Sequence, residues 1–538
     1  MSAFQAPPLL HLLKSNSLTT PFQYPVFKMM WIAMTISNVG TWMNEVGVTW
    51  LMATMPTSHL TIALIQTAIT LPFLFLAYPS GTLADLIDRR MMMLVIHIAM
   101  FLTAIGLAFF AFHDLLTPTL LLLFTFLLGT FNAIMRPAWS ASVLDFAPIE
   151  QLPNSVTLNT LSTNITRAVG PALGGFIIYL SGPTAIFTFN ALSFIVLIIT
   201  IYRWKPNTQK KQSSIPVERF FGAFKSGLRY VGNTRALRHV LARSFLFFFF
   251  ASASWALLPI VVIREMNMGS QSYGISMTVV GVGTVLGAFL LPKLHRVIGR
   301  NHIISLATII LSIALLLLAT VPSLYTLAIT LVVLGSAWIF SFSSLILAAQ
   351  TVVPNWVRAR SISILMLVFG GSMAFGSLLW GQLSDTYSTS TALGIAAIGL
   401  LTTLLFSRRF AIENDSINVS TSTQWPMIIP ENSIEADKGP VMVTIKYHVA
   451  DENIDAFIAL MDQMRVIRRR NGAYFWQLFH DANDHNVFSE MYMSESWLEV
   501  LRQRQRTTAS EFTIREQVIA LHIDENPPAI SIQIAGKA

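Results

Sequence analysis

Long apolar runs separated by short polar stretches dominate residues 27–410 of this 538-residue chain. A helix needs about 20 apolar residues to cross a bilayer, so each run predicts one membrane-spanning helix. The runs form two groups of six, residues 27–203 and 239–410, and so predict an all-α membrane domain in two six-helix halves. The twelve expected spans are 27–54, 60–83, 91–112, 118–138, 158–180, 184–203, 239–263, 272–294, 302–320, 324–347, 362–384 and 389–407.

Polar segments precede, divide and follow these spans. Residues 1–26 form a polar N-terminal segment without the short apolar core of a signal peptide. Residues 204–238 are a basic connection between the halves. From Val217 to Tyr230 apolar and basic residues recur at helical spacing, which predicts a helix lying on an anionic membrane surface. Residues 411–438, rich in Asn, Ser and Thr, are predicted to be a linker.

The remaining residues, 439–538, have the pattern of a small water-soluble domain. Apolar alternation predicts strands, and wider apolar spacing predicts two amphipathic helices. The order strand–helix–strand–strand–helix–strand predicts a small α+β ferredoxin-like domain. The strands are expected at 441–447, 473–480, 486–493 and 530–534, and the helices at 453–470 and 497–521.

Composition agrees with this division. The chain is 54% hydrophobic and 12% charged, whereas soluble proteins carry about 25% charged residues. Residues 1–410 hold 24 Lys and Arg against nine Asp and Glu, and residues 411–538 hold 11 against 18. The basic excess is scattered between the apolar spans, which argues against nucleic-acid binding. It falls in alternate connections between spans, which predicts that both termini lie in the cytoplasm. The absence of cysteine excludes disulfides and thiolate metal sites.

A charged turn lies between the second and third spans, from Gly81 to Arg90. Asp85 is placed where one helix ends, and Arg89 and Arg90 open the next. Such a cluster could close one end of a bundle or be an ordinary polar turn. The pattern G-x-L-A-D-x-x-D-R-R resembles the corresponding loop of the major facilitator superfamily, and that resemblance implies a cytoplasmic gate formed by Gly81, Asp85, Arg89 and Arg90.

The fifth expected span contains Gly170, Pro171, Gly174 and Gly175. Closely spaced glycines let a neighbouring helix approach, so we expect a helix-interface motif here. The order G-P-x-x-G-G resembles a signature of drug/proton antiporters, in which it lies between the halves. The resemblance favours export over import.

Ionisable residues inside spans are costly and are therefore candidates for ion coupling. Glu45, Arg136 and Arg167 are our candidates for proton coupling. Glu45 could equally be paired with an arginine in a structural role. Arg136 and Arg167 could bind an anionic substrate, but pairing with Asp145 is the favoured interpretation. By residue type, the candidates for lining a cavity are Asn38, Trp42, Asn132, Asn164, Trp255 and Trp338.

Together these features resemble the transmembrane secretion effector branch of the superfamily, which contains the enterobactin exporter. Glu45 departs from that branch, where an uncharged residue is expected, so its role cannot be transferred. The tail resembles the dimeric α/β-barrel domains of the antibiotic-biosynthesis monooxygenase group, which implies self-association through the C-terminal domain. It shows no metal-ligand spacing and no nucleophile constellation, so we expect no enzyme.

The expected function is export of a small amphipathic molecule, a siderophore or drug, across the bacterial inner membrane by alternating access coupled to protons. No phosphate-binding loop is present, and no cofactor, metal or nucleic acid is implied. Two alternatives remain. One is an importer or facilitator of the same fold, and the other is a membrane-tethered enzyme or ligand-binding tail.

Overall fold

The computed structural model describes residues 18–205, 220–320, 323–412, 435 and 437–535. The first 17 residues, the connection at 206–219 and most of the expected linker lie outside the described residues. The chain divides into two compact units. The first comprises Met1–Pro216, Leu241–Ile346 and Ser363–Ala411, and the second comprises Val217–Val240, Leu347–Ile362 and Ile412–Ala538.

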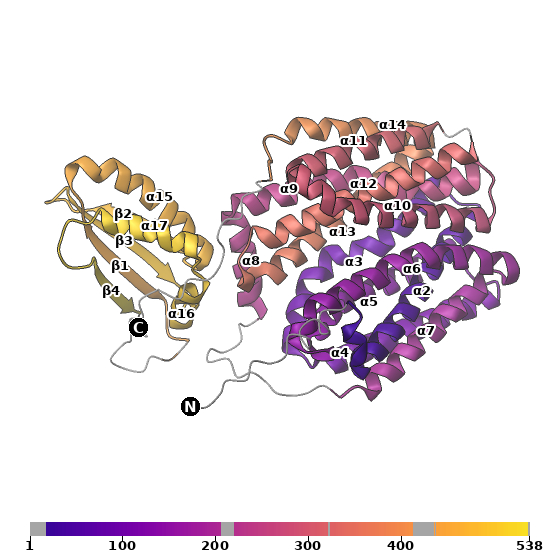
Figure 1. The fold of residues 1–538 in the computed structure, drawn as a ribbon, viewed down its shortest axis with the longest axis horizontal. Helices are drawn as coiled ribbons and strands as arrows, with labels where there is room; N and C mark the ends of the chain where they lie inside the picture. Colours follow the sequence, from indigo (N-terminus) through magenta and orange to yellow (C-terminus); the bar gives the residue numbers. More distant parts are fainter. Residues whose placement is uncertain (1–17, 206–219, 321–322, 413–434, 436, 536–538) are drawn as a thin grey trace, which may run out of the picture. The chain divides into compact units, whose positions relative to one another are not determined.

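The first unit is a bundle of long helices (Figure 1). Three of them, α9, α12 and α13, have one end in the second unit. The bundle helices are α2 (Pro25–Thr54), α3 (His59–Leu86), α4 (Arg89–Phe112), α5 (Pro118–Phe146), α6 (Leu152–Ser181), α7 (Pro183–Arg203), α9 (Arg235–Pro259), α10 (Ser270–Val297), α11 (Arg300–Ala319), α12 (Leu324–Thr351), α13 (Asn355–Thr386) and α14 (Thr389–Thr402). A π-helical turn, Ile260–Glu265, continues α9.

Local sequence explains where several of these helices begin and end. The side chains of Ser58, Asp88, Thr117 and Ser388 each accept a hydrogen bond from a backbone N–H in the first turn of the helix that follows. Gly182 has φ 76°, a left-handed conformation that ends α6, and a proline at the next position starts α7.

Among the described residues, ten helices are long and apolar enough to cross a membrane: α3, α4, α5, α7, α9 with its π-helical turn, and α10 to α14. The expected count of twelve is therefore not reached by this criterion. Helices α2 and α6 have 30 residues each, about 45 Å at 1.5 Å per residue. Polar residues such as Asn44, Glu45, Asn164 and Arg167 interrupt their apolar runs. That these two helices also cross the membrane stays a prediction.

The second unit contains a four-stranded antiparallel sheet in the order β2-β3-β1-β4. Helices α15 (Ile454–Asn471) and α17 (Ala509–Ala520) cover one face of it (Figure 1). The strands are β1 (Val441–His448), β2 (Phe475–His480), β3 (Val487–Ser494) and β4 (Ala529–Ile534). Alternate residues of β1 are buried in the core beside Trp476 and Trp497. The relation of this domain to a ferredoxin-like family stays a prediction.

The expected single helix at 497–521 is wrong. Two helices occupy this stretch, α16 (Trp497–Arg506) and α17, with an extended residue, Thr507, after the first. Thr508 then starts α17 through a capping box, in which its hydroxyl accepts from the Glu511 N–H and the Glu511 carboxylate accepts from the Thr508 N–H. The second unit also contains α8 (Phe220–Asn233).

Candidate functional site

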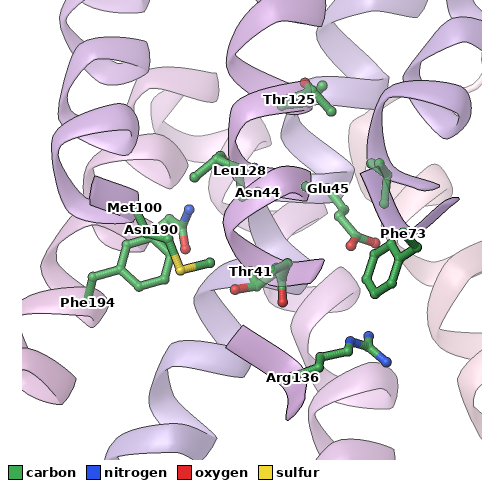
Figure 2. Close-up of a pocket in the computed structure, with 14 residues that line it drawn as sticks. Thr41, Asn44, Glu45, Phe73, Met100, Thr125, Leu128, Arg136, Asn190 and Phe194 are labelled. Atoms are coloured by element: carbon green, nitrogen blue, oxygen red, sulfur yellow. The ribbon is translucent and has the colours of Figure 1, made fainter. Parts of the chain in front are cut away.

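A pocket opens among the first six helices of the bundle (Figure 2). The empty volume among its lining residues, together with the open space at its mouth, is about 580 Å³. Amide, hydroxyl, carboxylate and guanidinium groups share its wall with apolar side chains. The lining residues are Thr41, Asn44, Glu45, Val48, Ile69, Phe73, Met100, Thr125, Leu128, Gly129, Asn132, Arg136, Asn190 and Phe194.

The lining residues of α2 and of α5 recur at helical spacing, so each of these helices turns one side toward the pocket. Thr41, Asn44, Glu45 and Val48 lie at positions i, i+3, i+4 and i+7 of α2, so they share a face. Residues 125–136 of α5 repeat this spacing. Selection by residue type alone missed Thr41 and Asn44, although the spacing in the sequence identifies them.

Glu45 is partly exposed, and Figure 2 shows its carboxylate beside the ring of Phe73. The charges of Arg167 and Arg136 both act on this carboxylate, that of Arg167 more strongly. Within the described part of the chain, however, no ion pair of 4.0 Å or less joins Glu45 to either arginine. The Arg136 guanidinium lies 5.3 Å from the centroid of Phe73, and that of Arg167 lies 5.2 Å from Trp42. Glu45 thus has two cationic neighbours and no tight partner.

Several buried polar atoms at or near this pocket lack a hydrogen-bond partner among the described residues. They are Oδ1 of Asn44, Oδ1 of Asn190 and Nε of Arg167. Buried polar groups in proteins are usually hydrogen-bonded, because an unmet donor or acceptor costs about 1–3 kcal/mol. A polar ligand or water in the pocket would supply the missing partners.

The charged turn between α3 and α4 is held by contacts within the first six helices. Arg89 Nη1 lies 3.4 Å from Asp145 Oδ2, and Arg90 Nε donates to the carbonyl oxygen of Ile201 at 3.2 Å. The expectation that Arg136 or Arg167 pairs with Asp145 is therefore wrong. The end of α5 brings Asp145 to the start of α4, whereas the two arginines lie farther inside the bundle near Glu45.

The other two residues of the expected gate lie at the end of α3. A Cβ atom on Gly81 would lie 3.3 Å from the hydroxyl of Ser363 in α13, so α3 and α13 approach closely there. Asp85 is in the last turn of α3, and its side chain lies outside the described residues.

The glycine-rich motif of α6 contacts two helices. Cβ atoms on Gly170 and Gly174 would lie 2.6 Å from Trp42 Cβ and 3.1 Å from Met43 Cα of α2. A Cβ atom on Gly175 would lie 2.5 Å from the carbonyl oxygen of Ser270 in α10. The carbonyl of Pro171 approaches Gly274 of α10 equally closely. The motif thus packs a helix of the first six against one of the second six.

Of the cavity candidates chosen by residue type, some lie at the pocket and others lie elsewhere in the bundle. Asn132 lines the pocket, whereas Asn38, Trp42 and Asn164 do not belong to its lining. Trp255 and Trp338 pack edge-to-face at 5.3 Å among phenylalanines of α9, α12 and α13. Residue type therefore identified one lining residue of the six.

Two residues that the sequence interpretation did not select hold the connection between α2 and α3. Arg264 donates to the carbonyl oxygens of Ala53, Met55 and Thr57, with its Nη2 2.8 Å from Met55 O. Asp385 of α13 accepts from two N–H groups at the start of α3, at 2.6 and 2.9 Å. Both side chains come from the second six helices. Nothing in the local sequence indicates these partners, because each contact spans more than 200 residues.

Solved structures show the same bundle. A variant of the nucleoside transporter NupG superposes with a TM-score of 0.60 at 14% identity, covering 72% of this chain and all of that one. A bacterial homologue of the human lysosomal transporter Spinster, solved inward-facing and unoccupied, gives 0.56 at 14% identity, covering 72% of this chain and 96% of the other. At this identity the likeness shows the fold alone, and the bundle has the fold of these solved transporters.

The family model described as transmembrane secretion effector matches residues 16–538. The chain belongs to this family, and the match extends through the C-terminal domain. The staphyloferrin A transporter of Staphylococcus aureus (strain NCTC 8325 / PS 47) is 23% identical over 381 residues, 69% of this chain and 93% of its own length. The multi-drug resistance efflux pump PmrA of Streptococcus pneumoniae serotype 4 (strain ATCC BAA-334 / TIGR4) is 28% identical over 45% of this chain and 59% of its own length.

Proposed function

We propose that this chain exports a small amphipathic molecule, a siderophore or drug-like compound, across the bacterial inner membrane in exchange for protons. The observation that carries the proposal is the pocket, in which, among the residues that the structure describes, the Glu45 carboxylate has no close ion pair and two buried amide oxygens lack partners. Such groups can bind a ligand or a proton without first breaking a structural bond. Two relatives, a staphyloferrin A transporter and a multi-drug resistance efflux pump, support this substrate class.

In this proposal Glu45 carries the proton. Its charge is balanced by Arg167 and Arg136 when it is ionised, and protonation leaves those two arginines available to an anionic part of the substrate. Binding of substrate and proton would therefore alternate. The apolar side of the pocket, including Phe73 and Phe194, would hold the apolar part of the same molecule.

Alternating access requires the two six-helix halves to rock against each other. The proposal assigns the glycine face of α6 to the moving contact, since glycine surfaces permit close sliding. It places the cytoplasmic gate at Gly81, Asp85, Arg89 and Arg90, with both termini in the cytoplasm and α2 and α6 completing twelve spans. Arg264 and Asp385 would close the opposite end and release it when the halves reorient.

The test uses everted membrane vesicles that contain the full chain and carry an imposed pH gradient. Staphyloferrin A and ethidium are added separately, and an acridine dye reports the gradient. Collapse of the gradient with vesicle uptake is the expected result, and Glu45→Gln should abolish the proton flux while the protein remains in the membrane. Substrate uptake without proton movement would contradict antiport. Because the lumen of an everted vesicle corresponds to the outside of the cell, substrate flux only out of the vesicles would show an importer.

The gate has its own test in the same vesicles. Asp85→Asn should lower transport without lowering the amount of protein in the membrane, because it removes one charge of the turn. Transport at the unaltered rate by this variant would refute the gate and leave the pocket assignment untouched.

A further inference from the structure

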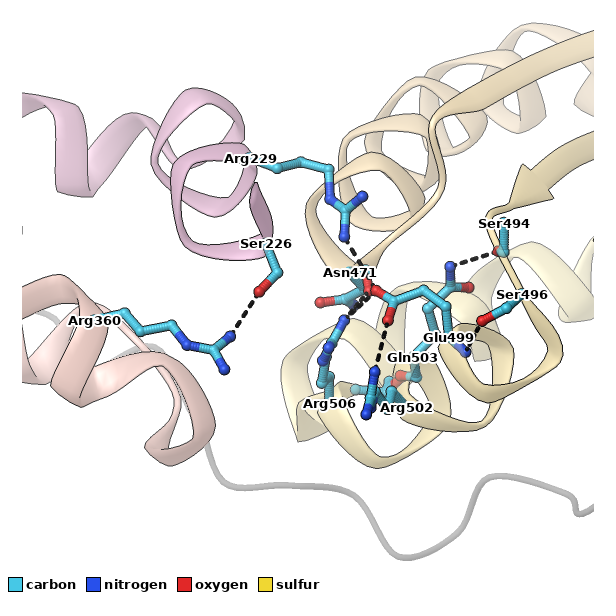
Figure 3. Close-up of polar contacts among 11 residues, drawn as sticks. Ser226, Arg229, Arg360, Asn471, Ser494, Ser496, Glu499, Arg502, Gln503 and Arg506 are labelled. Atoms are coloured by element: carbon cyan, nitrogen blue, oxygen red, sulfur yellow. Dashed lines mark hydrogen bonds and ion pairs between the residues drawn. The ribbon is translucent and has the colours of Figure 1, made fainter. Parts of the chain in front are cut away.

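The second compact unit joins three pieces that are far apart in the sequence (Figure 3). One is α8, the second is the junction of α12 and α13 at residues 347–362, and the third is the C-terminal domain. Two groups of side chains connect them. We call the first the Glu499 anchor, consisting of Arg229, Glu499 and Arg506, and the second the Trp356 anchor, consisting of Tyr230, Trp356 and Arg506.

The Glu499 anchor is an ion pair between α8 and the C-terminal domain. Arg229 Nη2 donates to Glu499 Oε1 at 3.1 Å, and Arg506 Nη1 donates to the same oxygen at 2.6 Å. The three side chains are only 15%, 10% and 6% exposed. Burial lowers the pKa of Arg229, while the Glu499 carboxylate opposes that shift. The Arg229 guanidinium is thus largely removed from water and paired with Glu499.

Residues of the C-terminal domain itself also contact this carboxylate and its partner Arg506. Gly472 follows α15 with φ 146°, and a Cβ atom there would lie 2.7 Å from Glu499 Oε1. Arg506 also donates to the carbonyl oxygen of Asn471 at 2.9 Å, which fixes its guanidinium beside Glu499. The acceptor for Arg229 is thus built by the domain itself.

The Trp356 anchor joins all three pieces. Tyr230 of α8 packs edge-on to the Trp356 ring with centroids 5.5 Å apart, and the guanidinium carbon of Arg506 lies 4.6 Å from the centre of that ring. Arg470 of α15 lies over Tyr230 in turn, at 5.6 Å. Beside these contacts, Arg360 donates to the hydroxyl of Ser226 at 2.6 Å, linking α13 with α8.

We propose that this surface is a docking site that fixes the C-terminal domain to the second six-helix half, so that the domain moves with that half during transport. The helices it contacts support the assignment: α8 leads directly into α9, and residues 347–362 join α12 to α13. Both segments therefore adjoin helices of the second half. The contacts include buried charged groups, and polar contacts of this kind are common between domains of one chain.

Cross-linking tests the docking in the full-length protein, which contains no cysteine. Cysteines replace Gly232, whose Cβ would meet no atom within 4 Å, and Arg469, an exposed neighbour of Arg470. A flexible bismaleimide should join them efficiently. The control combines Gly232→Cys with Asp524→Cys. Asp524 contacts His448 at one end of β1. The other end of β1, at Val441, is about 23 Å away along the strand. Equal yields for the two pairs would refute the docking.

Hydrogen exchange provides a second test without new cysteines. Arg229→Gln should speed exchange of the α8 amides by about tenfold or more, since local opening then no longer breaks the ion pair. The matched control is Arg465→Gln, which removes an arginine whose pair with Asp462 is 48% and 62% exposed, and it should leave α8 exchange unaltered. Unaltered exchange in Arg229→Gln as well would overturn the proposal.

The inference that the C-terminal domain moves together with the second six-helix half rests on the proposed function, and it is tested last. Vesicles with the Gly232–Arg469 cross-link in place should transport at a rate within about twofold of untreated vesicles, because the link joins parts that move as one body. A cross-link that stops transport would refute common movement. Absence of transport before cross-linking would count against the proposed function alone, since both docking tests would still stand.

Discussion

The bundle and the C-terminal domain each contain a cluster of charged side chains, and the two clusters are built in opposite ways. In the domain, Glu490 is fully buried and accepts two hydrogen bonds from Arg468, at 2.9 and 3.1 Å, and one from Trp476 at 2.9 Å. In the bundle, Glu45 has Arg167 and Arg136 as charged neighbours but no ion pair within 4.0 Å among the described residues.

The difference follows from the cost of removing charge from water. Burial alone would lower the pKa of Arg468, but the adjacent Glu490 carboxylate outweighs it and holds that pKa above its usual range. The pair therefore stays charged and fully hydrogen-bonded. Burial likewise raises the pKa of Tyr447, so its hydroxyl remains a donor to Glu490. Completed networks of this kind favour one structure, and breaking them is costly.

Within the described part of the chain, the cluster in the bundle is incomplete, and the amide oxygens of Asn44 and Asn190 beside it have no hydrogen-bond partner. An incomplete polar cluster weakens a fold unless something else occupies it. We infer that the first cluster serves stability and the second serves binding. The changes below test this contrast, from the largest expected effect to the smallest.

Glu490→Leu should destabilise the C-terminal domain by about 3–5 kcal/mol, because Arg468 would keep a buried charge without its partner. Hydrogen exchange of the β1 and β3 amides in the full-length protein measures this local stability. The matched control replaces both partners, Arg468→Met with Glu490→Leu, and should recover much of the loss. Unaltered strand exchange in the single variant would show that the network does not hold the domain.

Gly175→Ala should destabilise the bundle by about 1–3 kcal/mol through overpacking, because its Cβ would lie 2.5 Å from a backbone oxygen of α10. Thermal unfolding in detergent gives the change. Gly394→Ala in α14 is the control, since its Cβ would meet nothing within 4 Å and alanine favours a helix by about 1 kcal/mol. Equal melting temperatures for the two variants would mean that α6 and α10 can separate without cost.

Glu45→Leu should change the unfolding free energy of the bundle by no more than about 1 kcal/mol, in contrast to the same substitution at Glu490. No ion pair of Glu45 within 4.0 Å is present among the described residues to be lost, and an apolar side chain favours burial. The measurement is again thermal unfolding in detergent, compared with proton-coupled uptake by the same variant. A large loss of stability would make Glu45 structural and remove the contrast.

The sequence allowed the apolar helices and the strands to be predicted, because each is a local feature of pattern, whereas the role of Glu45 stays a prediction. The sequence also contained two overlooked local features, the spacing of Thr41 and Asn44 and the capping box from Thr508 to Glu511. The partners of Asp145, Arg264 and Glu499 could not be predicted. The contact from Arg229 to Glu499 spans 270 residues, and a single sequence carries no information about which surfaces meet.

Arg89→Gln should have the smallest effect on stability, about 0–1 kcal/mol, because its pair with Asp145 is roughly one-third exposed on both sides and is screened by solvent. The melting temperature in detergent should stay nearly constant, and added salt should hardly alter the difference from the unsubstituted protein. Transport should nevertheless fall if Arg89 belongs to the gate, since a gate acts through the difference between two states rather than through the stability of one. A variant that melts early and transports normally would reverse this assignment, and the turn between α3 and α4 would then belong with Arg468 and Glu490 among the structural charges.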